Sequence, residues 1–406
     1  MKAIIFGTGR AAGGFVAPAL HAAGYEIVFV ARGTPLRDHL NRTGRIEVAL
    51  VDGPKLERIV VDGVRAVEIT DHRALSNEFA SADLIATCVG PSNISDLGTP
   101  IANALARRLT PVNLIAFENH EAAGAMLRHA VATAGGQVTA HGFAGGLIHR
   151  VICRRSWDPG SNAPIRYTAD PESKCEIEAG ALQAAMPAIA GTTLVEDHVA
   201  AARRKFFTYS AAHVAVAYLG HLKGYHYIHA ALRDREIKRI VKKVLKEGQK
   251  GLDFVYGLGF SGGKAERKRI FRRLANGALQ DTVTRVGREP LRKLCRNERL
   301  VGAANLARLA NSKANSLSWV TAAALCFFDP NDASSRRLHA LIRDRGAEYV
   351  LQTVSGIDPA HDFAGRTIRR VAQLSTWSRS SHLITIKPAL WASQPVSAAA
   401  TAGLPQ

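Results

Sequence analysis

Cysteine is scarce in this sequence and is not arranged in pairs. The 406 residues contain five cysteines, an odd number, and none follows another at the Cys-x-x-Cys spacing. This pattern excludes a disulfide framework and a zinc ribbon, and it is typical of reduced thiols in a cytoplasmic protein. The sequence also lacks an apolar run of about 18 residues and an apolar leader with a small-residue cleavage site. We therefore expect no membrane span and a cytoplasmic location.

Acidic residues are few compared with basic ones. The chain has 34 aspartates and glutamates against 53 lysines and arginines, for a formal net charge of +19. An excess of this size attracts anionic ligands, and phosphorylated small molecules and nucleic acid both qualify. Nucleic acid is the less favoured partner, because the cationic stretches contain no interleaved aromatic platform and no nucleic-acid module is recognisable. We therefore expect a small anionic substrate.

Histidines are present without the spacing of a metal site. His221, His226 and His229 are separated by five and three residues and have no accompanying acid in a recognised order. A catalytic zinc ion needs several such ligands in a fixed geometry. The sequence therefore predicts no metal ion.

The hydrophobic pattern changes near residue 195. A chain of 406 residues exceeds what one core usually organises, so we expect two domains. Short apolar runs alternate with helical segments over residues 1–194, which predicts an α/β domain with a doubly wound, Rossmann-type sheet. Residues 195–381 predict a mainly α-helical domain, and residues 382–406 a loosely ordered tail. The expected strands are residues 2–6, 26–31, 82–89, 112–117 and 137–140, with residues 151–154 and 165–168 as extensions of the same sheet.

A glycine-rich turn follows the first expected strand and precedes a helix. Residues 7–12, Gly-Thr-Gly-Arg-Ala-Ala, match the Gly-x-Gly-x-x-Gly/Ala pattern of dinucleotide-binding domains. In that pattern the glycines let the backbone approach a pyrophosphate at a helix N-terminus. The alternative is an ordinary tight connection between a strand and a helix. The residues that we assign here to a cofactor site are Gly7, Gly9, Arg10, Ala11 and Ala12.

Two further turns indicate where a nicotinamide cofactor would lie. The second expected strand ends in Ala31-Arg32-Gly33, at a place where an acid selects NAD and an arginine accepts the 2′-phosphate of NADP. NADP is therefore favoured over NAD, and the alternative is that Arg32 is simply a solvated loop residue. Val89 and Gly90 end another strand and are expected to lie over the cofactor, because ligands of such sheets bind beyond the carboxyl ends of the strands.

The catalytic signatures of other dehydrogenases are missing. Tyr209 is followed four residues later by His213, so the Tyr-x-x-x-Lys pair of short-chain enzymes is absent, and no zinc-dehydrogenase signature is apparent. Residues 204–213 instead read Arg-Lys-Phe-Phe-Thr-Tyr-Ser-Ala-Ala-His. This segment resembles the polyol-specific long-chain dehydrogenases, the mannitol dehydrogenase family, whose pattern is Lys, four residues, Asn, two residues, His. Lys205 and His213 match that pattern, and Ser210 stands in place of the asparagine.

The resemblance implies how the catalytic residues act. Lys205 would be the general base for polyol oxidation and the acid for ketone reduction, without a metal, and His213 would hydrogen-bond the reacting oxygen. Partial burial and the nearby Arg203 and Arg204 would help the lysine to release its proton near neutral pH. On an uninterrupted helix Lys205 and His213 lie about 80° apart around the axis and about 12 Å apart along it, so a bend or the reach of the lysine must bring them together. The alternative is a surface lysine and a buried, hydrogen-bonded histidine.

Other segments of the family recur in order along most of the chain. Asn119 is expected at the substrate beside the nicotinamide, and its neighbour Glu118 at the cofactor site, whereas His149 occupies the place of a family aspartate. Residues 286–294 are close to the sugar-phosphate branch of the family. Guanidinium forks and ammonium groups suit a phosphate, and solvated helix faces are the alternative. The residues assigned to the substrate in this segment are Arg288, Arg292 and Lys293.

These observations predict a metal-independent NAD(P)-dependent oxidoreductase that interconverts a ketose, expected to be phosphorylated, and its polyol. His149 and Ser210 replace a carboxylate and an amide with an imidazole and a short hydroxyl, which alters the hydrogen bonds available to a substrate. One alternative is therefore a relative that acts on a different keto substrate. Another is a catalytically weak NADP-binding regulatory protein with anionic partners. Members of this family can be monomeric, which favours a monomer.

Overall fold

The computed structural model describes residues 1–374, so the tail expected at residues 382–406 lies outside the described part of the chain. These residues form two compact units. The sheet unit comprises Met1–Ser210, Tyr227–Ala230 and Val255–Asp281, and the helical unit comprises the remaining described residues. The chain thus leaves the sheet unit after Ser210 and returns to it twice. The boundary expected near residue 195 stays a prediction.

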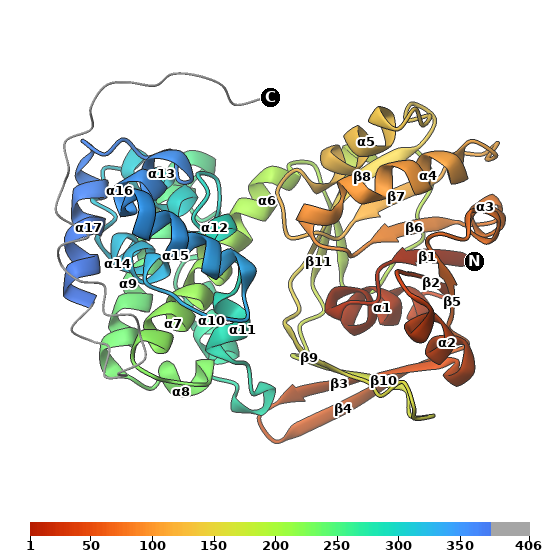
Figure 1. Cartoon of the computed structure of the whole chain (residues 1–406), viewed down its shortest axis with the longest axis horizontal. Helices are drawn as coiled ribbons and strands as arrows, with labels where there is room; N and C mark the ends of the chain where they lie inside the picture. The colour runs from red at the N-terminus through yellow and green to blue at the C-terminus, as the bar shows by residue number, and fades with distance from the viewer. Residues whose placement is uncertain (375–406) are drawn as a thin grey trace. The chain divides into compact units, whose positions relative to one another are not determined.

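The main sheet of the sheet unit has the predicted doubly wound, Rossmann-type topology. Neighbouring strands are parallel except for the pair β8 and β11, and the strand order is β12-β11-β8-β7-β6-β1-β2-β5 (Figure 1). The strands are β1 (Lys2–Phe6), β2 (Glu26–Ala31), β5 (Arg65–Glu68), β6 (Leu84–Thr87), β7 (Asn113–Ala116), β8 (Gly142–Ile148), β11 (Cys175–Glu178) and β12 (Thr192–Val195).

Both faces of this sheet are covered because its central strands are apolar on both sides. In β1, Ala3 and Ile5 belong to the hydrophobic core on one face, and Ile4 and Phe6 belong to the core on the other, as the alternation of side chains along a strand requires. The first face is covered by the π turn η1 (Ala12–Val16) with α1 (Ala17–Ala22), and by α2 (Thr34–Thr43). The second face is covered by α3 (His72–Ala80), α4 (Gly98–Leu105) and α5 (Ala123–Thr133).

A second, four-stranded sheet corrects the prediction for residues 151–154 and 165–168. These residues do form strands, β9 (Ile152–Ser156) and β10 (Ile165–Ala169), but they do not extend the main sheet. They join a hairpin that the sequence analysis did not assign, β3 (Arg45–Asp52) and β4 (Lys55–Asp62), in the order β4-β3-β10-β9. The reason is that β3 alternates buried and less buried residues and pairs with β10 in parallel, which gives β10 a partner away from the main sheet.

The strand predicted at residues 137–140 is wrong. Those residues form a loop, and the strand that follows it is β8. Its sequence, Gly-Phe-Ala-Gly-Gly-Leu-Ile, is fully buried and contains three glycines. Glycine is depleted in strands, so the composition of β8 concealed the strand from a propensity argument.

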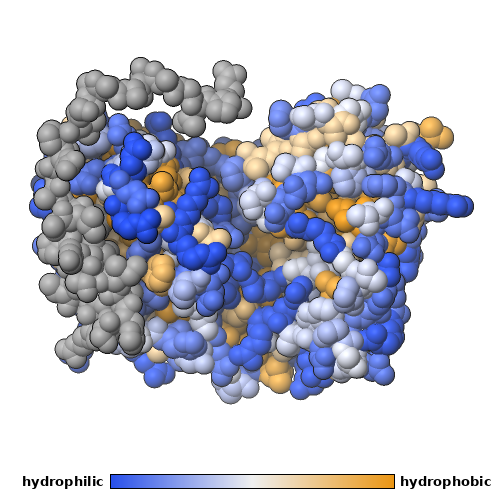
Figure 2. All heavy atoms as spheres, viewed as in Figure 1, coloured by the Kyte–Doolittle hydropathy of each residue, from blue (hydrophilic) through white to orange (hydrophobic). Residues whose placement is uncertain are grey.

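The helical unit is built from helices, as predicted. Its central helix α14 is buried along nearly its whole length and packs against α7, α13 and α17. Most of the visible surface of each unit is hydrophilic (Figure 2), and no helix among residues 1–374 is long and apolar enough to cross a membrane. The helices that lie largely in this unit are α7 (Ala211–Leu222), α9 (Arg235–Tyr256), α11 (Val283–Gly287), α12 (Pro290–Lys293), α13 (Val301–Leu309), α14 (Asn315–Leu325), α15 (Ala333–Arg345), α16 (Ala347–Thr353) and α17 (Asp362–Leu374).

Candidate functional site

A cavity of about 470 Å³ lies at the carboxyl ends of β1, β2 and β6 in the sheet unit. Gly7, Gly9, Arg32 and Val89 line it, as the sequence predicted for a cofactor site. A dinucleotide site is expected at this edge of a doubly wound sheet. The volume also falls within the range of about 300–1,000 Å³ that is usual for ligand sites. The residues present therefore fit a nicotinamide dinucleotide.

The glycine-rich turn needs its glycines for two physical reasons. Gly7 has a φ of +92°, and a Cβ atom there would lie 2.7 Å from the carbonyl oxygen of Cys88. Gly13 follows in η1, where a Cβ atom would lie 2.2 Å from the ring of Tyr167 on β10. Gly7 makes the tight turn at the cavity, and Gly13 lets the helix pack closely against the second sheet. Arg10 and Ala11 lie between them and lead into η1, which begins at Ala12.

Glu118 lies behind the cavity and shapes its wall. Its carboxylate accepts hydrogen bonds from the backbone N–H groups of Val89 and Gly90, each at 2.7 Å. Burial raises the pKa of Glu118, and the two backbone donors oppose that shift. Glu118 therefore holds the turn after β6 in place, and its cofactor role stays a prediction.

Two arginines line the cavity, Arg32 and Arg155. Only Arg32 was predicted from the sequence. Arg32 is 57% exposed and lies 3.8 Å from Asp96, which is 60% exposed, and such a surface ion pair contributes at most about 1 kcal/mol. Arg155, on β9, donates a hydrogen bond of 2.9 Å to the carbonyl of Thr8 in the glycine-rich turn. Trp157 lies beside it in the wall of the cavity. The signal for Arg155 was weak because β9 belongs to a sheet that was not predicted.

Lys205 and Asn119, which the family pattern assigned to catalysis and to the substrate, meet in the sheet unit. Lys205 is the last residue of α6 (His198–Lys205), a helix whose N-cap Asp197 accepts a hydrogen bond from the N–H of Ala200. Asn119 follows β7, and its Oδ1 accepts a hydrogen bond of 3.2 Å from Lys205 Nζ. Lys205 also lines a cavity of about 140 Å³, which is large enough for one end of a sugar-sized substrate rather than for the whole molecule.

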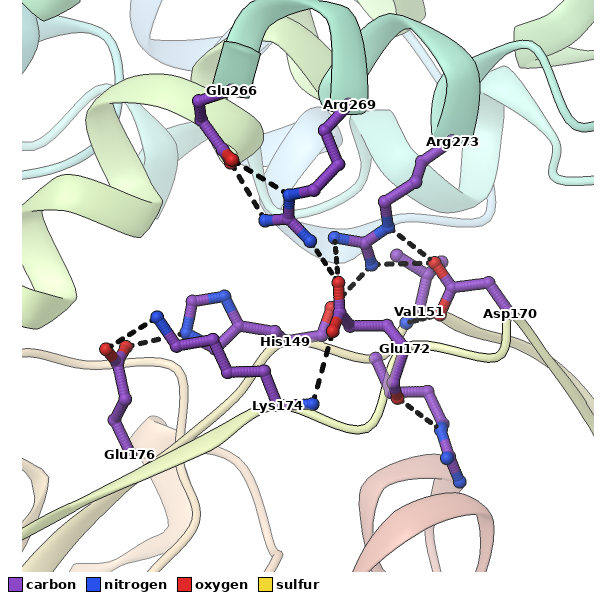
Figure 3. A network of polar contacts seen from close by, with 10 residues as sticks. His149, Val151, Asp170, Glu172, Lys174, Glu176, Glu266, Arg269 and Arg273 are labelled. Atoms are coloured by element: carbon purple, nitrogen blue, oxygen red, sulfur yellow. Dashed lines mark hydrogen bonds and ion pairs between the residues drawn. The ribbon is translucent and has the colours of Figure 1, made fainter. Parts of the chain in front are cut away.

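A buried carboxylate, Glu176 on β11, organises the cations around this cavity (Figure 3). Its two oxygens contact His149 Nε2 at 2.7 Å, Lys174 Nζ at 2.8 Å and Arg204 at 2.5 Å. The side chains of His149 and Glu176 are 7% and 3% exposed. Lys174, Arg204 and His149 line the cavity, so the carboxylate holds three hydrogen-bonding groups at its edge.

The charges of this group follow from its burial. Burial lowers the pKa of His149 to about 4, although the hydrogen bond with Glu176 opposes this shift, so the imidazole is neutral at pH 7. Burial alone would raise the pKa of Glu176. The hydrogen bonds with His149 and Lys174 outweigh this effect and lower the pKa to about 2. A neutral imidazole donates and accepts hydrogen bonds where the family aspartate would only accept them.

Two arginines of α10 (Gly263–Leu274) extend this network on the opposite wall (Figure 3). Arg269 pairs with Glu266 at 2.8 Å and with Glu172, and it lines the cavity. Arg273 pairs with the buried Asp170 at 2.6 Å and donates a hydrogen bond of 2.7 Å to the carbonyl of His149. Arg273 thus positions the backbone of His149, while Arg269 presents charge to the cavity.

The arginines beside Lys205 are themselves paired. Arg203 contacts Glu121 at 2.8 Å and Tyr256 at 3.0 Å, and Arg204 contacts Glu176. The positive charges of Arg203 and Arg204 are therefore partly compensated, which weakens the effect on the pKa of Lys205 that the sequence suggested.

The remaining predicted residues lie elsewhere. Ser210 is buried at the end of the π turn η5 (Phe206–Ser210), and His213 is buried on α7 in the helical unit. In the helical unit, Arg292 pairs with Glu289 at 2.7 Å and Glu298 at 2.8 Å. The ammonium group of Lys293 is buried and donates to the carbonyls of Val286 and Arg288, whereas the Arg288 side chain is exposed. Arg292 and Lys293 therefore already have protein partners. Among residues 1–374 no group of three or more His, Cys, Asp or Glu side chains is placed to hold a metal ion.

The buried imidazole makes stability depend on pH in a defined window. The pKa of His149 is about 4 in the folded protein and about 6.5 in the unfolded chain, so only the unfolded chain takes up this proton between these values. Folding should therefore weaken by up to about 3 kcal/mol as the pH falls from 6.5 to 4. Urea unfolding at pH 7 and pH 5 measures this slope. A His149→Gln variant should have a shallower slope, and a variant of the exposed His72, His72→Gln, should keep it. If the free energy of unfolding depended on pH equally in the wild type and in His149→Gln, the lowered pKa of His149 would be contradicted.

Comparison with known proteins agrees with the fold of each unit. The family model of the mannitol dehydrogenase Rossmann domain matches residues 1–191, and that of the mannitol dehydrogenase C-terminal domain matches residues 199–359. The chain is 33% identical over 397 residues to the mannitol-1-phosphate 5-dehydrogenase of Brevibacillus brevis, covering 94% of this chain and 100% of that protein. It is 29% identical over 384 residues to the enzyme of the same name from Thermoanaerobacter pseudethanolicus, covering 92% and 98%.

Solved structures share the fold at lower identity. A mannitol 2-dehydrogenase of Pseudomonas fluorescens, in a ternary complex with NAD and D-mannitol, has a TM-score of 0.78 and 16% identity over 93% of each chain. A D-sorbitol dehydrogenase has a TM-score of 0.69 and 14% identity over 91% of each chain. At this level of identity the likeness concerns the fold alone.

Proposed function

This chain belongs to the mannitol dehydrogenase family of oxidoreductases that act on CH–OH groups, and from that premise we propose that it interconverts a ketose phosphate and its polyol phosphate in the manner of a mannitol-1-phosphate 5-dehydrogenase. The observation that carries this proposal is the hydrogen bond between Lys205 Nζ and Asn119 Oδ1 at the edge of a cavity lined by four cations. Those cations are Lys174, Arg204, Lys205 and Arg269.

Proton transfer is the step that this chain's residues provide. A reduced nicotinamide, when bound, would supply the hydride that reduces the carbonyl carbon and would itself be oxidised. The electron pair of the C=O bond then moves to the oxygen, which takes a proton from the ammonium group of Lys205 to form the alcohol. In polyol oxidation the neutral amine of Lys205 removes the same proton. Asn119 holds the lysine through its Oδ1, which fixes the distance over which the proton moves.

The π turn η5 lies between Lys205 and His213 in the sequence. We propose that His213 hydrogen-bonds the reacting oxygen, because Lys205 and His213 match the catalytic pattern of the family.

We propose that the substrate's phosphate lies against Lys174, Arg204 and Arg269. These cations line the cavity together with one carboxylate, Glu266, a partner of Arg269, whereas Glu172 and Glu176 do not line it. Positive charges therefore outnumber the single negative charge in the lining. A phosphate there would gain charge-assisted hydrogen bonds from guanidinium and ammonium groups.

Replacing Arg269 tests this phosphate contact. Arg269→Gln should raise KM for fructose 6-phosphate about tenfold, since one charge-assisted hydrogen bond is removed, and should leave KM for fructose nearly unchanged. Steady-state kinetics with both ketoses measures the difference. Arg292→Gln is the matched comparison, because the sequence assigned the phosphate to that residue. A selective increase for fructose 6-phosphate in Arg292→Gln alone would overturn the proposal.

Cofactor preference can be tested at Arg32. We propose that the enzyme prefers NADP and that Arg32 contacts its 2′-phosphate, because this arginine lines the cofactor cavity and its surface ion pair is weak. Wild-type protein should bind NADPH more tightly than NADH, and Arg32→Ser should weaken NADPH binding about tenfold while sparing NADH. Fluorescence titration measures both dissociation constants. Equal constants for the two cofactors in the wild type would contradict the preference.

The proposed reaction is tested by a cofactor-oxidation screen. Fructose 6-phosphate, other ketose phosphates and free ketoses are each supplied with NADPH and with NADH, and the absorbance of the reduced cofactor is followed. The proposal predicts the fastest oxidation with a ketose phosphate. Faster turnover of an unphosphorylated keto compound would favour a different substrate, and NADPH binding without turnover of any of them would favour a regulatory protein.

A further inference from the structure

The helical unit contains a separate basic cavity that the proposed reaction does not use. It has a volume of about 1,030 Å³ and is lined only by residues of the helical unit. Its walls are the end of α13 with the loop that follows it, and the loop that leads into α17. The second loop includes Gly356 to Asp358.

Positive charge exceeds negative charge in this cavity. Its cations are Arg296, Arg308, Lys313 and Arg366, and its carboxylates are Asp358 and Asp362. Both carboxylates are partly engaged, because Asp358 accepts a hydrogen bond from the N–H of Ala360 and the exposed Asp362 pairs with Arg366 at 3.4 Å. The lining therefore keeps a surplus of two positive charges.

Hydrogen-bond donors also lack acceptors here. Within residues 1–374, neither the Arg296 guanidinium nor the Lys313 ammonium makes a hydrogen bond or an ion pair. The Nε of Arg366 is buried and has no hydrogen-bond partner in the described chain, although its Nη2 donates to the carbonyl of Lys313 at 2.7 Å. An anion in the cavity would provide an acceptor for the guanidinium of Arg296 and the ammonium of Lys313.

The contacts of His361 show the same excess of donors. Its Nδ1 lies 3.0 Å from the backbone nitrogen of Phe363, and its Nε2 faces Arg308. Burial and the charge of Arg308 lower the pKa of His361, so the ring is neutral and can accept at only one nitrogen. If the hydrogen is on Nδ1, that N–H group faces the backbone N–H of Phe363. If it is on Nε2, that N–H group faces the guanidinium of Arg308. Arg366 also lowers the pKa of Arg308, in addition to the larger effect of burial.

We propose that this cavity binds a phosphate-bearing small molecule, separate from the substrate. Oxygen atoms of the ligand's phosphate would accept from the lining cations, which include Arg296 and Lys313, and a charge of minus two or more would match the surplus in the lining. The volume is at the upper end of the range of about 300–1,000 Å³ for small-molecule sites. The ligand class is thus a phosphorylated metabolite rather than an apolar compound.

Calorimetric titration with pyrophosphate tests the proposal at constant ionic strength, with the cofactor site saturated with NADPH. The cavity variant is Arg296→Gln combined with Lys313→Gln, two cations without protein partners, so the fold should be unaffected. The control is Lys242→Gln combined with Lys246→Gln, which removes the same charge from the exposed face of α9. Each substitution in the cavity variant removes a charge-assisted hydrogen bond to the anion, so binding should weaken about tenfold or more. Binding should stay unchanged in the control.

Three results would overturn the proposal. The first is the absence of pyrophosphate binding to wild-type protein. The second is equal binding by the wild type and the cavity variant, and the third is an equal loss of affinity in the control, which would indicate diffuse attraction to the basic surface. Arg269→Gln, which alters the cavity at Lys205, should leave this binding intact. That result would show that pyrophosphate binding in the helical unit is tested independently of the proposed substrate site at Lys205.

Discussion

Lys205→Met is expected to lower kcat for ketose reduction by about 10²- to 10⁴-fold, the contribution usual for general acid–base catalysis. Methionine approaches the length of the lysine side chain but has no proton to donate and cannot form the hydrogen bond that links Nζ to Asn119. The glycine-rich turn and Arg32, which line the cofactor cavity, are unchanged by this substitution. The dissociation constant for NADPH should therefore stay within about twofold of the wild-type value.

A lysine on the surface of the second sheet provides the matched control. Lys55 on β4 is exposed, and Lys55→Met should leave both kcat and cofactor binding unchanged. If Lys205→Met kept kcat within about tenfold of wild type, Lys205 would be an ordinary helix residue and the proton would come from another group.

Glu176→Gln is expected to lower the free energy of unfolding by about 1.5–3 kcal/mol, because hydrogen bonds to a buried carboxylate are weakened while its charged partners Lys174 and Arg204 remain 37% and 30% exposed. Glutamine keeps the volume of the side chain and removes the negative charge. The ammonium of Lys174 and the guanidinium of Arg204 would then lose their shared carboxylate, and His149 would lose a charged hydrogen-bond partner. Urea unfolding at pH 7 measures the change.

An exposed ion pair shows what the same chemical change costs at the surface. Arg45 and Asp62 lie 2.7 Å apart with side chains that are 50% and 59% exposed. Asp62→Asn should change the free energy of unfolding by less than about 1 kcal/mol. Equal changes in Glu176→Gln and Asp62→Asn would mean that burial does not strengthen the contacts of Glu176.

Local patterns were sufficient to predict the cofactor fold. The turn at Gly7 follows a buried strand and precedes a helix, and each step involves residues that are close in sequence. The family pattern likewise placed Lys205 and Asn119 in one site, where the structure has them in contact. By contrast, the strands β9 and β10 were assigned to the wrong sheet, because β10 pairs not only with β9 but also with β3, which is far away in the sequence.

The organisation of His149 was not predictable from its neighbours. Glu176 contacts it because β11 pairs antiparallel with β8, which places Glu176 opposite Leu147. This pairing joins residues from strands that local patterns had not assigned, and an acid in a short strand carries no signal that it will be buried. Arg269 and Arg273 come from a helix that the sequence placed in the second domain, although α10 belongs to the sheet unit. Long-range pairing therefore determined the part of the site that the sequence did not reveal.

The most direct test of this account is deuterium transfer from NADPH labelled at the nicotinamide C4 to fructose 6-phosphate, followed by mass spectrometry of the product. The account predicts a hexitol phosphate that carries the deuterium on the former carbonyl carbon. It also predicts that Lys205→Met forms this product at least about 10²-fold more slowly. Binding of NADPH without any labelled hexitol phosphate from the wild-type protein would contradict the account.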